Sequence, residues 1–457
     1  MSYGLKPLAG LLACLSAGVL TGCVQIGTAD SRYQGAAPLA HGPVRNDAPH
    51  GMPGHGLPDH GLPVHSLSEE RLAVLDRVMK EYVASGKLAG AVVMIHQDGR
   101  EVFSNAYGWR DREAGDAMEE DDIFRIASQT KALTSVAIMM LMEEGKLLLE
   151  DPLGKFMPEW SKTTVAVARD GGGYDVVPAR RAITIRDLLS HSAGISYGSG
   201  PGEKAWRDAG IFGWYFADRN ETVADVVKRM PALPMAAQPG EAWVYGYNTD
   251  ILGALVETLS GLSLDVFFKQ RLLDPLGMKD TSFCLPPEKS SRLAVVYSAK
   301  DGRTERAPAP GSWTGAGHIG QGHYETGPCK AFAGGAGLLS TAKDYSRFLE
   351  MLRRGGELDG RRYLSRKSVE QMSQNALVSA PYQPGQSFGL GFRITEAPGK
   401  MGNLGSSGDY GWGGAYHSTY WIDPAEGLTV TFMTQLIPSG GLDTQAKLRA
   451  LIYAALE

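Results

Sequence analysis

The chain has 457 residues, of which 43% are hydrophobic and 21% are charged. A chain of this length and composition is globular, can bury a large core, and forms one large or two ordinary domains. Its 45 basic and 50 acidic residues give a formal net charge of -5 at pH 7, and it has no basic cluster. The charge therefore gives no electrostatic reason to expect a nucleic-acid partner.

The first 23 residues have the layout of a secretory signal. Lys6 precedes an apolar run over 8–20, which ends in Leu20-Thr21-Gly22-Cys23. The run is shorter than the roughly 20 apolar residues of a transmembrane helix. Its ending resembles the bacterial lipobox, in which the cysteine is lipid-modified and becomes the new N-terminus. We therefore expect a lipid-anchored protein of the bacterial cell envelope, in the outer membrane or on the periplasmic side of the inner membrane. An ordinary signal peptide with a chance cysteine is the alternative.

Residues 24–65 read as a tether. Histidines recur every five residues at His50, His55, His60 and His65, with glycine and proline between them. Glycine and proline disfavour helix and strand, so we expect a spacer that spans roughly 35 Å as a random coil. Loose binding of a metal ion by the four imidazoles is the alternative.

Cysteine usage leaves two thiols in the mature chain. If Cys14 leaves with the signal and Cys23 carries lipid, only Cys284 and Cys329 remain. They could form a disulfide in an oxidising envelope, or stay as two buried free thiols. No metal cluster can be built from them.

The folded part is expected to begin at Ser66, with a helix whose first turn is acidic. Asp98-Gly99 lies between two apolar stretches, which predicts a hairpin of two antiparallel strands. The following apolar stretch predicts a buried helix from about Ser128 to Glu144.

Ser128 and Lys131 are three residues apart at the start of this helix, so their side chains face the same way. Ser128 would lie at the positive end of the helix dipole, where backbone N–H groups can stabilise a developing oxyanion. Burial of the Lys131 amine would favour its neutral form, which can take the serine proton. By itself the pattern is weak, because a serine that begins a helix is usually only a cap.

Ser196 is the competing nucleophile. The stretch GISYG, residues 194–198, matches the Gly-x-Ser-x-Gly motif of lipases, which works as a sharp turn between a strand and a helix. Here the motif follows a helix end, with Gly194 as the expected cap, and runs into an expected loop. We therefore reject Ser196 as the nucleophile.

Two later stretches support Ser128. Tyr245 lies in a polar turn just before a helix that carries Asp250 and Gly253 at helix-compatible positions. Trp412-Gly413-Gly414 is expected at the start of a strand, and a second strand is expected after Asp423-Pro424. The glycine pair lets the backbone approach a substrate closely.

With these three motifs in order, the chain resembles the serine β-lactamase and penicillin-binding-protein superfamily, and within it the family VIII carboxylesterases. Ser128, Lys131, Tyr245 and Trp412-Gly413-Gly414 match the three catalytic motifs. The second motif of β-lactamases is Tyr-x-Asn, whereas Tyr247 stands at the third place here and Asn248 comes one place too late. Trp412 replaces the lysine of the third β-lactamase motif, and both departures favour the esterase branch.

The resemblance implies an α/β fold of the α+β type, in which an antiparallel sheet flanked by helices carries a mostly helical second subdomain. The α/β part would comprise residues 66–155 and 330–457, and the helical part residues 156–329. The aromatic residues of the stretch 205–216 could wall a substrate pocket, although core packing fits most of them better.

The implied reaction is hydrolysis of short-chain esters through an acyl-enzyme on Ser128, without metal or cofactor. Lys131 and Tyr245 would act as base, and the N–H groups of Ser128 and Ala415 would hold the oxyanion. The alternatives are a β-lactamase or D-Ala-peptidase-like enzyme, a transacylase, and a non-enzymatic lipoprotein whose histidine tether captures metal.

Overall fold

The computed structural model describes residues 66–314, 317–380 and 382–457. The predicted signal, the predicted lipidation site Cys23 and the predicted tether over residues 24–65 lie outside the described residues. The described residues all belong to one compact unit.

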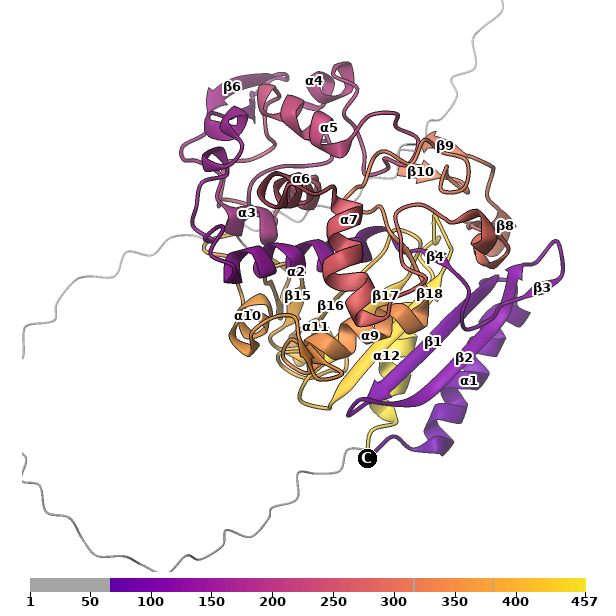
Figure 1. The fold of residues 1–457 in the computed structure, drawn as a ribbon. Helices are drawn as coiled ribbons and strands as arrows, with labels where there is room; N and C mark the ends of the chain where they lie inside the picture. Colours follow the sequence, from indigo (N-terminus) through magenta and orange to yellow (C-terminus); the bar gives the residue numbers. More distant parts are fainter. Residues whose placement is uncertain (1–65, 315–316, 381) are drawn as a thin grey trace, which may run out of the picture. The chain divides into compact units, whose positions relative to one another are not determined.

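An eight-stranded antiparallel sheet joins the two ends of the folded chain (Figure 1). Its order is β14-β15-β16-β17-β18-β1-β2-β3, so that β1 pairs with β18 and Val93 lies opposite Phe432. The strands are β1 (Gly90–Gln97), β2 (Arg100–Asp111), β3 (Asp116–Ala117), β14 (Gln386–Phe388), β15 (Arg393–Thr395), β16 (Tyr410–Gly413), β17 (Thr419–Asp423) and β18 (Leu428–Thr434).

The predicted hairpin at Asp98-Gly99 is confirmed. Both residues have positive φ, 50° and 81°, which is the backbone form that a two-residue turn between right-twisted strands requires. The first predicted helix is α1 (Glu69–Ala84), whose first turn contains Glu69 and Glu70.

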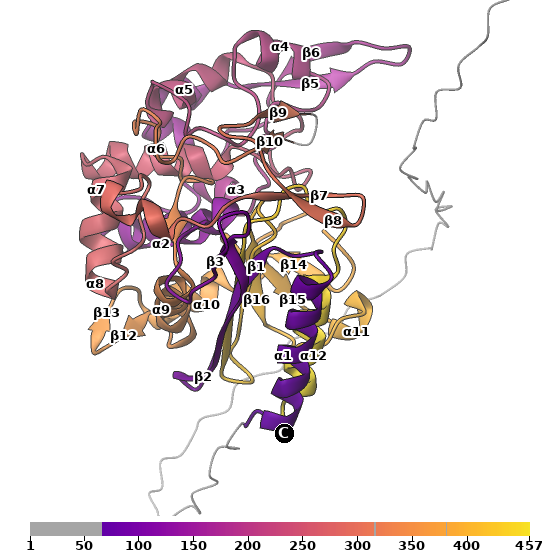
Figure 2. The same cartoon turned by 90° about the vertical axis from the view of Figure 1, so that its right-hand side faces the viewer.

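Helices cover both faces of the sheet. α1 and α12 (Thr444–Ala454) lie side by side on one face, and α9 (Ala342–Arg353) covers the other face (Figure 2). Beyond α9 lies α2 (Thr130–Glu143), which is buried from Thr130 to Leu141 and packs against α6 (Asn248–Ser260). Because α2 is apolar on all sides, it fits only between two layers of the protein.

The region between the first and last sheet strands is mostly helical and also holds small hairpins. Its helices are α3 (Ile185–Leu189), α4 (Glu203–Asp208), α5 (Val223–Arg229), α6, α7 (Leu264–Phe268) and α8 (Asp274–Leu276), with a π-turn over Lys269–Leu273. Its paired strands are β5 (Thr164–Ala168) with β6 (Tyr174–Pro178), β7 (Tyr297–Lys300) with β8 (Arg303–Arg306), and β9 (Ser312–Thr314) with β10 (Gly317–Ile319).

The remaining elements are short. They are β4 (Phe124–Arg125), β11 (Leu339–Ser340), β12 (Glu357–Leu358), β13 (Arg361–Arg362), α10 (Arg366–Met372), α11 (Pro398–Met401), and 3-10 turns over Ala127–Gln129, Leu153–Lys155, Pro158–Ser161, Met230–Ala232 and Pro287–Arg292. β4 pairs with β11, which brings the segment before Ser128 against the chain near residue 340. The architecture is the expected α/β fold with a large antiparallel sheet flanked by helices.

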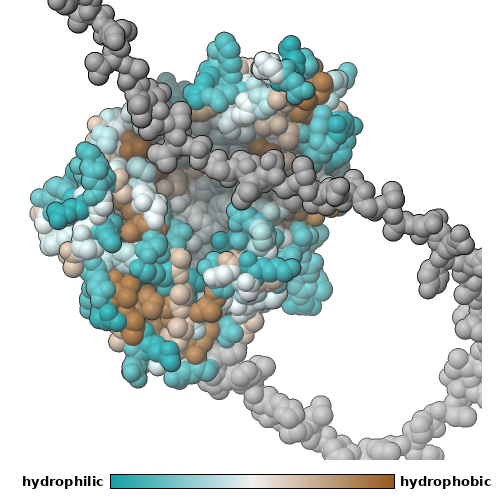
Figure 3. All heavy atoms as spheres, turned by 180° about the vertical axis from the view of Figure 1, so that it is seen from behind, coloured by the Kyte–Doolittle hydropathy of each residue, from teal (hydrophilic) through white to brown (hydrophobic). Residues whose placement is uncertain are grey.

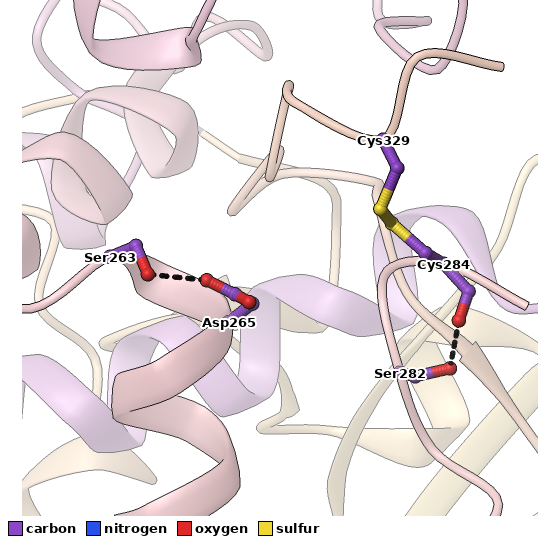
Figure 4. Close-up of a disulfide and its surroundings, with 5 residues drawn as sticks. All are labelled: Ser263, Asp265, Ser282, Cys284 and Cys329. Carbon is purple, nitrogen blue, oxygen red and sulfur yellow. Dashed lines mark hydrogen bonds between the residues drawn. A yellow bond between two sulfur atoms is a disulfide. The ribbon is translucent and has the colours of Figure 1, made fainter. Parts of the chain in front are cut away.

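A disulfide joins Cys284 to Cys329, with the two Cα atoms 5.9 Å apart (Figure 4). The Ser282 hydroxyl donates to the Cys284 carbonyl at 2.7 Å, which fixes the local backbone. The structure thus favours the disulfide over the two free thiols that the sequence left open.

The described surface is mixed in polarity, and its helices are short. Hydrophilic residues cover most of the face seen in Figure 3, with hydrophobic residues grouped between them. Among the described residues, no single helix is long and apolar enough to cross a membrane. The segments Asn248–Ser260 and Leu264–Leu276 meet that test only as a pair bent by 78°.

Three local predictions are wrong. Trp412 and Gly413 end β16 rather than begin a strand, because the chain turns back at 414–418 into β17 before it reaches Asp423. α3 ends at Leu189 and is capped at Ser190, so Gly194 is not its cap. The segment after GISYG also contains a helix, α4, although four residues separate its first residue from Gly198.

Candidate active site

The nucleophile candidate Ser128 lies in the 3-10 turn Ala127–Gln129, directly before α2. The helix therefore begins two residues later than predicted. Ala127 has a φ of 42°, in the left-handed region that a residue with a Cβ rarely adopts. Such strain occurs where the surrounding structure fixes a functional residue, and here it turns the Ser128 side chain into a pocket.

The amine of Lys131 has three close partners. Its Nζ atom lies 3.2 Å from Ser128 Oγ, 2.9 Å from Tyr197 Oη and 2.7 Å from the Gly335 carbonyl oxygen. A neutral amine has two N–H donors and one lone pair. If Tyr197 and Gly335 take the two donors, the lone pair is left facing the Ser128 hydroxyl.

Tyr197 can serve as a fixed acceptor because its own hydroxyl stays protonated. Burial, with Tyr245 and Asp250 nearby, raises the pKa of Tyr197 well above its ordinary value. A neutral phenol oxygen can accept from Lys131 without carrying a charge into the site.

Tyr245 also lies beside the lysine, with its ring edge-to-face against Tyr197 and the two ring centroids 5.7 Å apart. Its ring centroid is 4.6 Å from Lys131 Nζ, and its hydroxyl accepts a hydrogen bond from the Trp412 indole Nε1 at 3.1 Å. The next residue, Gly246, is packed so tightly that a Cβ there would lie 2.3 Å from the Ile195 carbonyl oxygen. The turn that carries Tyr245 is therefore held directly against the segment that carries Tyr197.

The third motif brings backbone next to the nucleophile. A Cβ on Gly414 would lie 2.5 Å from the Ile126 carbonyl oxygen, so only glycine allows the end of β16 to approach the turn of Ser128. Within the described residues, neither the Ser128 N–H nor the Ala415 N–H has a hydrogen-bond partner. These two donors fit the requirements of an oxyanion hole.

These groups surround one pocket of about 360 Å³. The lining residues are Ser128, Tyr197, Trp214, Tyr245, Arg393, Trp412, Gly413, Gly414, Ala415, Ser418, Thr419 and Gln445. Of the aromatic residues in the stretch 205–216, only Trp214 lines this pocket, whereas Trp206, Tyr215 and Phe216 are buried.

Ser196 is not part of this pocket. Its side chain is buried, and its hydroxyl donates to the Ser199 carbonyl at 2.7 Å. The neighbouring Tyr197 is the residue of that stretch that touches Lys131, and the sequence interpretation missed it. Nothing in a Gly-x-Ser-x-Gly pattern marks the residue after the serine as the partner of a distant lysine.

Asn248 and Tyr247 explain the departure in the second motif. The Asn248 amide lies 2.9 Å from His191 Nδ1 and also donates to the Ile195 and Val244 carbonyls at 3.2 Å, so it braces the turn. Burial and Lys131 lower the pKa of His191 well below its ordinary value, which leaves its ring neutral. Tyr247 is fully buried and donates to the Gly213 carbonyl at 2.7 Å.

A sheet packed between helices, with a serine–lysine–tyrosine cluster between α2 and β16, is typical of serine hydrolases. The Beta-lactamase family model matches residues 75–455, and the chain belongs to this family.

Curated relatives include esterases. The chain is 34% identical over 389 residues to Protein Rv1367c of Mycobacterium tuberculosis, covering 80% of this chain and 91% of the relative. It is 29% identical over 385 residues to Esterase EstB of Burkholderia gladioli, with the same two coverages of 80% and 91%.

The solved structure of EstCE1, described as a hydrolase with promiscuous acyltransferase activity, matches with a TM-score of 0.71. It is 26% identical and covers 84% of this chain and 99% of its own. Together these relatives support a serine hydrolase in general terms.

Proposed function

We propose that the protein is a serine carboxylesterase that hydrolyses short-chain esters through an acyl-enzyme on Ser128. The position of Lys131 Nζ, which lies 3.2 Å from Ser128 Oγ, 2.9 Å from Tyr197 Oη and 2.7 Å from the Gly335 carbonyl oxygen, is the observation that carries the proposal. It supplies an amine whose free lone pair faces the hydroxyl that has to lose a proton.

In the first half of the reaction, Ser128 Oγ bonds to the ester carbonyl carbon while its proton passes to the Lys131–Tyr245 pair. The carbonyl oxygen becomes an oxyanion held by the N–H groups of Ser128 and Ala415. The bond from carbon to the leaving oxygen then breaks, and Tyr245 passes the proton to the leaving alkoxide. An acyl-enzyme and a free alcohol result.

In the second half, a water molecule gives a proton to the same pair and bonds to the acyl carbon. The bond to Ser128 Oγ breaks, the proton returns to the serine, and the acid is released. An acceptor alcohol in place of water would give transacylation, the activity attributed to EstCE1 beside hydrolysis.

The test compares two serines. Ser128→Ala should abolish hydrolysis of a p-nitrophenyl butyrate ester, and Ser196→Ala should leave most of it, because the Ser196 hydroxyl bonds only to the Ser199 carbonyl. A fluorophosphonate should label the wild type and Ser196→Ala but not Ser128→Ala. An inactive, unlabelled Ser196→Ala variant with intact fold would overturn the assignment.

A second candidate is hydrolysis of amides or esters that carry a carboxylate, as in a β-lactamase or a D-Ala peptidase. Arg393 on β15 favours it. This guanidinium lines the pocket, its Nε is buried without a partner, and it forms no ion pair within the described residues. The nearby Asp409 carboxylate is already bound by Arg449 and Thr395. Burial, with Arg449 beside it, lowers the pKa of Arg393.

Trp412 opposes this second candidate. It offers an apolar face and one N–H where the related β-lactamases place a lysine, and that N–H already bonds to Tyr245. An anion packed against the indole would lose solvation without gaining an ion pair from Trp412 itself. We therefore expect neutral esters to be better substrates than penicillins.

The two candidates are separated by kcat/KM for a neutral butyrate ester, a penicillin and a cephalosporin. The carboxylesterase candidate predicts that kcat/KM of the wild type is much higher for the ester than for the penicillin and the cephalosporin. This difference should be smaller in Trp412→Lys. Arg393→Met should leave the neutral ester unaffected and, under the second candidate, should slow only the anionic substrates. Wild-type enzyme that cleaves penicillin as well as the ester would replace the first candidate with the second.

A further inference from the structure

Asp250 is a buried carboxylic acid for which the reaction above has no use. It lies in the first turn of α6 with a relative exposure of 1%. Burial raises its pKa to about 6, although Lys131 nearby favours the charged form. Its Oδ2 atom is buried and has no hydrogen-bond partner within the described residues. Isolated charges of this kind are costly and persist where they serve a site.

The other oxygen of Asp250 reaches the partner of the lysine. Oδ1 accepts a hydrogen bond from the Gly335 N–H at 2.9 Å, and the carbonyl of the same glycine accepts from Lys131 Nζ at 2.7 Å. A single residue thus joins the carboxylate to the amine. Gly335 has to be glycine, because a Cβ there would lie 2.5 Å from Asp250 Oδ2.

The loop that carries Gly335 is attached to α2 at further points. The Gly334 carbonyl accepts from the Thr134 hydroxyl at 2.7 Å, and the Leu338 N–H donates to the Thr130 hydroxyl at 3.1 Å. The disulfide at Cys329 holds the start of the same loop. From the side of α6, Asp250 accepts a hydrogen bond from this loop, next to the close packing of Gly253 against Gly334.

We propose that Asp250 is a positioning residue for Lys131. By holding Gly335, it keeps one carbonyl acceptor in place, so that the lone pair of the neutral amine points at Ser128 Oγ. The inference rests on the proposed acyl-enzyme at Ser128. Without the Gly335 acceptor, the lysine can rotate its lone pair away from the serine, and misplacement of this kind costs about 10²-fold in rate.

The carboxylate also acts through its charge. The titratable groups that face it are Lys131 on α2, Tyr197, and Tyr247 beside it, and burial raises the pKa of both tyrosines, so that they stay neutral. Above pH 6 the carboxylate is ionised and places a negative charge near the site. Removing this charge should therefore move the acid limb of the pH–rate profile to lower pH.

Two substitutions at Asp250 separate the effect of its hydrogen bond to Gly335 from the effect of its negative charge. Asp250→Asn keeps an oxygen that can accept from the Gly335 N–H but removes the charge. It should keep kcat within about tenfold and move the acid limb of the pH–rate profile to lower pH. Asp250→Ala removes the acceptor as well and should lower kcat by about 10²-fold with little change in KM. Gly335→Ala disturbs the same contact from the loop and should resemble Asp250→Ala.

Asp344 provides the matched control. This buried carboxylate on α9 accepts from the Asp280 N–H at 2.7 Å and from the Thr281 hydroxyl at 2.9 Å. Burial raises its pKa also. Asp344→Asn should lower the melting temperature and leave kcat and the pH profile of the folded enzyme unchanged.

Fluorophosphonate labelling of wild-type Ser128 is measured first, since its absence would mean that the proposed function has failed. With wild-type labelling established, folded Asp250→Ala enzyme with normal kcat and an unshifted pH profile would overturn the positioning role. If Asp250→Ala does not fold, an unshifted profile in Asp250→Asn together with normal kcat in Gly335→Ala overturns it equally.

Discussion

At the scale of single residues, the site depends on which hydroxyl groups are free to react. Ser128 and Ser196 both lie next to turns with unusual backbone geometry, yet only Ser128 faces an amine and a pocket. The Ser196 hydroxyl donates its hydrogen bond to the Ser199 carbonyl, three residues away. The groups that contact a serine in the folded structure therefore decide whether it can act as a nucleophile, more than the sequence motif in which it stands.

Tyr245 and Tyr247 form a natural pair for separating catalysis from stability. Tyr245→Phe should lower kcat by about 10²- to 10⁴-fold, because it removes a proton carrier from the reacting serine. A lost structural hydroxyl costs only about 1 kcal/mol of stability. The measurement is kcat for the butyrate ester together with a thermal melt.

Tyr247→Phe is the control for this prediction. The hydroxyl of Tyr247 donates to the Gly213 carbonyl in the core and does not line the pocket. We expect a lower melting temperature with almost normal kcat. Near-normal turnover in folded Tyr245→Phe would assign the proton transfer to another group.

At the scale of elements, the sequence predicts those parts that depend on local pattern. The hairpin at Asp98-Gly99, α1, and the apolar helix α2 with the serine and lysine at its start follow from periodicity and turn chemistry. The prediction fails where pairing decides the structure. β16 and β17 are joined by a short turn that contains no Asn-Gly or Asp-Gly signal. The sequence therefore does not predict that one strand ends at Gly413 and another begins at Thr419.

The parts of the site that the sequence did not reveal come from long-range packing. Gly335, 204 residues from Lys131 in the chain, and Tyr197, 66 residues away, both meet its amine. Nothing in the sequence around Gly335 or Tyr197 indicates that these residues contact the Lys131 amine. Arg393 was missed for the same reason, because an unpaired arginine can be recognised only when its surroundings are known.

At the scale of the whole molecule, the described domain contains the complete candidate site, so catalysis should not depend on the N-terminal segment. Residues 128, 131, 245 and 412–415 all lie within the described ranges. We therefore expect a protein that lacks residues 1–65 to keep its activity. Because the candidate site lies outside the N-terminal segment, substitutions in that segment can test the membrane anchor without loss of activity.

We propose that Cys23 is lipid-modified and anchors the protein to the envelope, on the basis of the apolar run and Leu20-Thr21-Gly22-Cys23 in the sequence. Acyl chains hold a protein at a membrane because each buried CH₂ contributes about 0.8 kcal/mol. Wild-type protein expressed in a Gram-negative host should sediment with membranes and require detergent for release. Its N-terminal peptide should carry acyl chains on Cys23 in mass spectra.

Cys23→Ser should be released from the membrane or mislocalised, while the purified variant keeps the kcat of the wild type for the butyrate ester. Cys14→Ser, which changes the other cysteine of the predicted signal, is the matched control and should still partition with detergent, because Cys14 lies inside the apolar run that we expect to be removed. Wild-type mature protein that is soluble and begins at a residue other than Cys23 would contradict the anchor. In that case the 42 residues from 24 to 65 would have a function other than holding the domain away from a membrane.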